Sequence, residues 1–187
     1  MKSREGTVVD ADELMDEMVE TARAQSEEKG KLEGVADEDA NQLFEMLGLG
    51  ALKYFMLKVD PKKRMLFNPA ESIDMQGNTG PFIQYTHARI KSVLRKAEDA
   101  GARLQRVPEQ MNAINDNERA LIQLIYQFPE TVKLAGDEYS PAVIANYAYE
   151  LAKEYNTFYH ECPILIEEDE NVKALRLAIS ALTSDVI

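Results

Sequence analysis

The chain has 187 residues, with 33 acidic against 21 basic side chains and a formal net charge of −12. This length suffices to bury a core without disulfides or metals, and the lone Cys162 excludes an internal disulfide and favours a reducing compartment, the cytoplasm. The acidic balance excludes a protein that coats nucleic acid non-specifically, and the sequence contains neither a signal peptide nor the roughly 20 apolar residues that a membrane-spanning helix needs.

The first predicted element is an amphipathic helix that follows Asp10 and ends near Lys29 and Gly30. Carboxylates fill its first turn, where they favour the helix dipole. Its apolar side consists of residues at helical spacing, namely Leu14, Met15, Met18, Val19 and Ala22. The polar segment Lys31 to Val35 contains a glycine and predicts a break after this helix.

A second helix is predicted from Asp37 to about Val59, and it contains two glycines, Gly48 and Gly50, that favour a bend or close packing of helices. A turn at residues 60–63 follows, and residues 64–68 are apolar enough for a strand or an extended segment. The loop Gly77 to Gly80 then marks a domain boundary, so that residues 1–80 and 81–187 are expected to be separate parts of the chain.

The strongest helical pattern runs from Phe82 to about Gly101. His87, Lys91 and Arg95 are each four residues apart and therefore share one face of this helix. Residues 81–107 hold six basic and two acidic side chains, a local charge of +4 in an acidic chain. A run of charge is also typical of a solvated helix face, and that interpretation stays open.

The remainder of the chain predicts further helices. One begins at a cap formed by Asn115 or Asp116 and ends at Gln127, and a shorter one is expected to restart at Pro129. Ser140 and Pro141 predict another helix start, and the last helix is entered through residues 167–170. Together these patterns predict a mainly α protein.

Three segments resemble, in the same order, signatures of the arginyl-tRNA synthetase family. They are MKSREGTVVDADEL at residues 1–14, GLGALKY at residues 48–54 and GNTGPFIQYTHAR at residues 77–89. Ordered matches of this length are more specific than one short motif. The resemblance implies a carboxy-terminal fragment in which residues 1–80 end the catalytic domain and residues 81–187 form an all-α anticodon-binding bundle, truncated at its carboxy terminus.

The opening resembles the family's KMSKS loop, which closes on ATP during amino-acid activation. The matching residues are Lys2, Ser3 and Arg4, although Ser3 stands where that motif has its second lysine and Arg4 where it has its last serine. The family's nucleotide-binding domain and arginine pocket would precede Met1. The resemblance therefore implies that the full-length enzyme uses ATP with Mg, whereas this fragment binds no cofactor and is inactive alone.

The resemblance also implies a site that binds the anticodon of the tRNA for arginine. Its expected residues lie on the helix that begins near Phe82 and on a later helix, and they are Gln84, Tyr85, His87, Arg89, Lys91, Arg95 and either Tyr155 or Tyr159. Bases stack on aromatic rings with roughly 1 to 3 kcal/mol each. Core packing for the tyrosines, and a structural ion pair for Arg89, remain alternatives. The other expected partner is the missing catalytic domain, with no DNA and no membrane.

The same sequence also allows less specific interpretations. The chain is alternatively an acidic helical protein-interaction module whose basic helix is only a surface. His160 and Cys162 lack the third and fourth ligands of a structural zinc site, so no metal is expected. The acidic residues 167–170 are interpreted as a solvated helix start that complements the dipole.

Overall fold

The computed structural model describes residues 10–28, 36–102 and 114–187. Lys2, Ser3 and Arg4 lie outside the described residues, as does the expected break at residues 31–35. The chain divides into two compact units, Met1–Pro81 and Phe82–Ile187, and each is described by itself.

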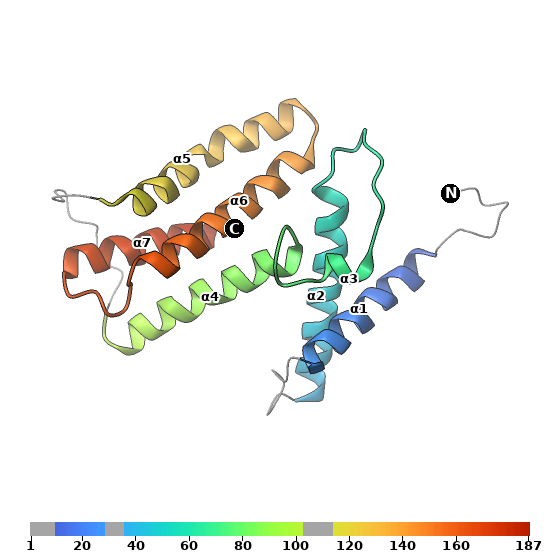
Figure 1. Cartoon of the computed structure of the whole chain (residues 1–187), viewed down its shortest axis with the longest axis horizontal. Helices are drawn as coiled ribbons and strands as arrows, with labels where there is room; N and C mark the ends of the chain where they lie inside the picture. The colour runs from blue at the N-terminus through green and yellow to red at the C-terminus, as the bar shows by residue number, and fades with distance from the viewer. Residues whose placement is uncertain (1–9, 29–35, 103–113) are drawn as a thin grey trace. The chain divides into compact units, whose positions relative to one another are not determined.

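The described residues form helices joined by turns, and no strand occurs among them (Figure 1). The prediction of a mainly α protein is therefore confirmed. Residues 64–68 have no regular secondary structure. The helices are α1 (Ala11–Glu28), α2 (Asp37–Leu57), α3 (Pro69–Ser72), α4 (Gly80–Asp99), α5 (Asp116–Asp137), α6 (Pro141–Glu161) and α7 (Glu170–Val186).

The first unit has a small core between α1 and α2. Its buried apolar side chains are Met18, Ala22, Phe44, Ala51, Leu52 and Ile73. At Gly48 the two helices approach so closely that a Cβ would lie 2.8 Å from the backbone carbonyl carbon of Met18. Glycine is required there because real Cβ atoms do not come so near to a backbone. The sequence pattern had favoured close packing at this glycine.

The second unit has the larger core, to which α4, α5, α6 and α7 all contribute. Its buried side chains are Ile90, Val93, Ala97, Leu121, Leu151, Tyr155, Phe158, Cys162, Ile164, Leu175, Leu177 and Ile179. The expected helix break at Pro129 was wrong, because α5 runs through this proline. A proline removes only one backbone hydrogen bond of a helix, and α5 stays packed on α6 next to it, where Phe128 lies 5.8 Å from Tyr147 between ring centroids.

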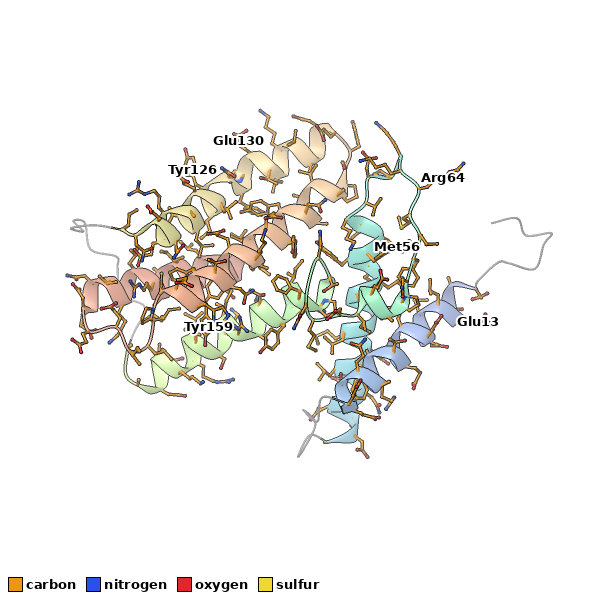
Figure 2. All side chains as sticks on the ribbon, in the orientation of Figure 1. Glu13, Met56, Arg64, Tyr126, Glu130 and Tyr159 are labelled. Carbon is orange, nitrogen blue, oxygen red and sulfur yellow. The ribbon has the colours of Figure 1, made fainter. Side chains whose placement is uncertain are left out.

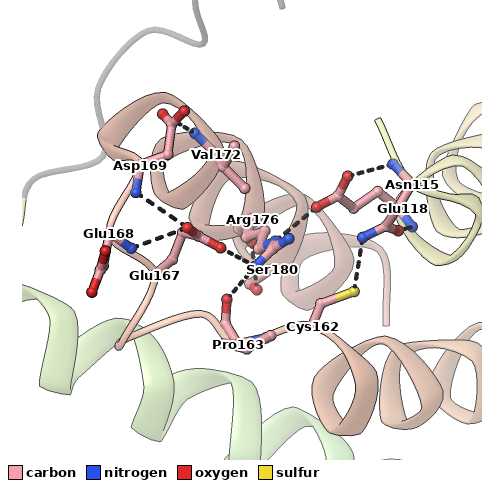
Figure 3. Close-up of polar contacts among 10 residues, drawn as sticks. All are labelled: Asn115, Glu118, Cys162, Pro163, Glu167, Glu168, Asp169, Val172, Arg176 and Ser180. Carbon is pink, nitrogen blue, oxygen red and sulfur yellow. Dashed lines mark hydrogen bonds and ion pairs between the residues drawn. The ribbon is translucent and has the colours of Figure 1, made fainter. Parts of the chain in front are cut away.

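Buried ion pairs connect α5, α7 and the segment between α6 and α7 (Figure 3). Arg176 of α7 is 8% exposed, and its Nε donates to Glu118 of α5 at 2.7 Å. Its Nη1 donates to Glu167, also at 2.7 Å, and to the carbonyl of Pro163, both in the connection between α6 and α7. The two carboxylates and the carbonyl thus compensate the buried guanidinium charge.

The acidic residues before α7 have two distinct roles in the structure. Asp169 caps the helix, because its Oδ1 accepts from the backbone N–H of Asn171 at 2.8 Å and of Val172 at 3.3 Å. Glu167, in contrast, pairs with Arg176. The interpretation as a helix start therefore holds for Asp169, while Glu167 is part of the ion-pair cluster.

Candidate functional site

Helix α4 has one buried face and one polar face. Ile90, Val93 and Ala97 face the core of the second unit, whereas Lys91 and Arg95 are exposed. Because these two cations follow each other by four residues, they stand one above the other on the outer surface. Among the described residues neither of them forms an ion pair, so their charge is directed to solvent.

Three of the residues expected in the binding site form one cluster across α4 and α6. The Cζ atom of Arg89 lies 5.0 Å from the ring centroid of Tyr85 and 5.1 Å from that of Tyr159. Figure 2 labels Tyr159, which α6 contributes to this Tyr85–Arg89–Tyr159 cluster. Both distances are within the range in which a guanidinium is attracted to the face of an aromatic ring.

The two rings of the cluster remain accessible. Tyr85 is 41% and Tyr159 is 38% exposed, while Arg89 between them is half-buried. An aromatic ring that is fixed on one side by a cation and open on another can accept a further planar group without reorganisation. The cluster is thus suited to contact a flat, negatively charged ligand such as an unpaired nucleotide.

The hydrogen bonds that connect Arg89, Asn156 and Thr86 were not foreseen from the sequence. Arg89 Nη1 donates to Oδ1 of Asn156, and Nδ2 of Asn156 donates to Thr86 Oγ1 at 2.8 Å and to the carbonyl of Ala152 at 2.8 Å. Thr86 is fully buried on α4. Asn156 and Thr86 are 70 residues apart in the chain, and no local spacing rule relates them.

Tyr155 must be removed from the candidate site. Its ring is 0% exposed in the core of the second unit, and its hydroxyl donates to Ser180 Oγ at 3.1 Å. Burial raises the pKa of the Tyr155 phenol to about 12, and the hydrogen bond to Ser180 opposes this rise in part. A side chain without exposed surface cannot stack on a base, so Tyr159 is the candidate that remains of the two expected alternatives.

The other expected residues occupy the same helix without joining the cluster. Gln84 and His87 of α4 are half-buried. His87 begins the series that Lys91 and Arg95 continue, one and two turns further along. These residues would extend the contact surface from the cluster along α4.

The described residues contain no group of three His, Cys, Asp or Glu side chains that could hold a metal ion. Cys162 is buried, and its Sγ accepts from Nδ2 of Asn115 at 3.3 Å. His160 packs edge-on against Tyr159, with 5.7 Å between the ring centroids. No helix in the described part of the chain has both the length and the apolar character needed to cross a membrane.

Comparison with known proteins gives consistent results. Residues 83–187 match the family described as the DALR anticodon binding domain. The whole chain is 58% identical to a protein of Bacteroides thetaiotaomicron named arginine–tRNA ligase, over 190 residues. It is 56% identical to the protein of that name from Bacteroides fragilis. The chain spans 31% of the length of each of these two relatives.

Solved structures show the same similarity. The arginyl-tRNA synthetase of Thermus thermophilus superposes with a TM-score of 0.80 and 31% identity, over 96% of this chain and 30% of that chain. The arginyl-tRNA synthetase of Plasmodium falciparum gives a TM-score of 0.76 and 27% identity, over 95% of this chain and 31% of that chain. The matched regions include both units of the chain described above.

Proposed function

Because this chain belongs to the DALR anticodon-binding domain family, we propose that it is the tRNA-binding portion of an arginine–tRNA ligase and recognises the anticodon region of the tRNA for arginine. The observation that carries the proposal is the Tyr85–Arg89–Tyr159 cluster, which lies inside the matched segment and presents two half-exposed rings. The names of the relatives, which are arginine–tRNA ligases, support the choice of tRNA.

The cluster would bind RNA by stacking and by charge. An anticodon loop displays unpaired bases that can stack on Tyr85 and Tyr159. Arg89 adds a cation with a planar fork of N–H donors, suited to a phosphate or a base edge. Lys91 and Arg95 would contact neighbouring phosphates and so orient the RNA along α4. The remainder of the acidic chain would repel RNA, which confines binding to this surface.

The first unit would belong to the end of the catalytic domain. In this proposal residues 1–80 connect the missing catalytic domain to the bundle, and the full-length enzyme attaches arginine to its tRNA in the cytoplasm with ATP and Mg. Lys2, Ser3 and Arg4 would be the part of the ATP site that this chain retains, so we expect no arginine-dependent ATP–pyrophosphate exchange by the chain alone, even with tRNA present.

Equilibrium binding of transcribed tRNA tests the proposal. The full 187-residue chain should bind the tRNA for arginine more tightly than a non-cognate tRNA of equal length, with a modest dependence on salt. Equal affinity for both tRNAs, or no binding, would favour the alternative of an acidic helical module that interacts with proteins. A swap of anticodon loops between the two tRNAs then shows whether the preference follows the anticodon.

A further inference from the structure

We propose that Asn156 is a positioning residue for RNA binding, because it holds the Arg89 guanidinium between the rings of Tyr85 and Tyr159. The inference rests on the proposed function, and it adds a residue that neither the sequence pattern nor the family resemblance indicates. Asn156 acts through Arg89, so this role does not require Asn156 to touch RNA.

The hydrogen bonds around Asn156 fix which way its side-chain amide points. Thr86 has one hydroxyl hydrogen, and it donates this hydrogen to the carbonyl of Phe82 at 2.9 Å. The Thr86 oxygen can therefore only accept from Asn156, so the NH2 group of Asn156 must face Thr86 and the carbonyl of Ala152. The remaining amide oxygen faces Arg89 and accepts from its Nη1.

This arrangement connects the two helices that carry the rings. Thr86 and Arg89 belong to α4, whereas Asn156 and Ala152 belong to α6. The Asn156 amide thereby bonds to both helices at the level of the cluster. A guanidinium held at this point is in contact with one tyrosine from each helix.

This arrangement favours binding because it pre-organises the Arg89 side chain. A free arginine side chain loses rotamer entropy when it is immobilised. If Asn156 immobilises Arg89 before RNA arrives, the RNA does not have to supply this ordering. Among the described residues only Asn156 accepts a hydrogen bond from the Arg89 guanidinium, so the other N–H groups of this guanidinium remain available to a phosphate or a base edge.

A double-mutant cycle separates positioning from simple packing. The variants are Asn156→Ala, Arg89→Ala and the combination, and each is measured for affinity to the tRNA for arginine in the full chain. Asn146→Ala is the matched control, since Nδ2 of Asn146 also donates to a carbonyl one turn earlier on α6, that of Ala142 at 2.7 Å. Circular dichroism and urea unfolding report whether each variant keeps the fold.

Positioning predicts that Asn156→Ala weakens tRNA binding about tenfold, because the RNA must then order the Arg89 side chain itself. It also predicts that Asn156→Ala has no further effect once Arg89 is alanine. Asn146→Ala should leave tRNA affinity unchanged. In NMR spectra of the free protein, the Arg89 side-chain protons should lie upfield because of the two rings, and Asn156→Ala should return them toward ordinary shifts.

Other outcomes overturn the inference in distinguishable ways. If wild type does not prefer the tRNA for arginine, the proposed function fails and the inference falls with it. If wild type binds but Asn156→Ala binds equally well, or loses the same factor with and without Arg89, only the inference fails. Should Asn156→Ala lose helix content, Asn156→Leu replaces it in the cycle, since it keeps most of the volume and removes the oxygen that accepts from Arg89, and the same criterion applies.

Discussion

Two successive turns of α6 place chemically identical side chains in different environments. Tyr155 faces inward, is fully buried and donates to Ser180. Tyr159, one turn further along, lies against Arg89 and keeps 38% of its surface exposed. The comparison shows that the role of a tyrosine on this helix depends on what α4 and α7 place opposite it, because the two residues share the same helix and nearly the same angular position.

The largest expected effect of this difference is on stability. Tyr155→Ala should lower the free energy of unfolding of the second unit by about 3 to 5 kcal/mol, because it leaves a cavity in the core. Tyr159→Ala should change it by less than about 1 kcal/mol, because the ring is partly exposed. Urea unfolding of both variants measures the contrast. Equal losses for the two variants would show that Tyr159 is also a core residue.

A smaller effect is expected in alkaline solution. The pKa of Tyr155 is raised by burial to about 12 from 10.0, so the folded state favours the neutral phenol. The resulting stabilisation is complete below pH 10 and is lost as the pH rises from about 10 to about 12, which amounts to on the order of 2 kcal/mol. Over this interval the free energy of unfolding should fall less with rising pH for Tyr155→Phe than for wild type. Parallel curves for the two proteins would contradict the burial argument.

The smallest effect concerns the exposed cations beside the cluster. Lys91→Ala and Arg95→Ala should each weaken binding of all tRNAs alike, and each should lower the slope of log affinity against log salt by about one. Lys133→Ala on α5 provides an exposed basic control outside this surface. A loss of preference for the tRNA for arginine, without a change in slope, would mean that Lys91 or Arg95 reads bases instead of contacting phosphates.

Local rules predicted much of the fold. A cap at Asn115 or Asp116 and a helix start at Ser140 and Pro141 were foreseen from residue type. In the structure Asn115 is the cap of α5, and α6 begins at Pro141. The continuation of α5 through Pro129 was missed, because its packing against α6 cannot be deduced from the proline itself. Local chemistry dominates at helix ends, whereas tertiary contacts decide helix interiors.

The candidate site was predictable only in part. The family resemblance indicated Tyr85 and Arg89, but helical spacing alone did not distinguish Tyr155 from Tyr159. Asn156 was missed altogether, because its significance comes from Arg89, which is 67 residues away in the chain. Contacts of this kind depend on how α4 and α6 pack, and one sequence contains no signal for that register.

Tyrosine substitution tests the central claim, that the Tyr85–Arg89–Tyr159 cluster binds tRNA. The affinity of the full chain for the tRNA for arginine is measured for Tyr85→Ala, Tyr159→Ala and the control Tyr126→Ala, whose ring on α5 is 84% exposed (Figure 2). With helix content unchanged, the account predicts a loss of roughly 1 to 3 kcal/mol for Tyr85→Ala and for Tyr159→Ala, and none for Tyr126→Ala. Wild-type affinity in both cluster variants would contradict the account and place the RNA-binding surface elsewhere on the domain.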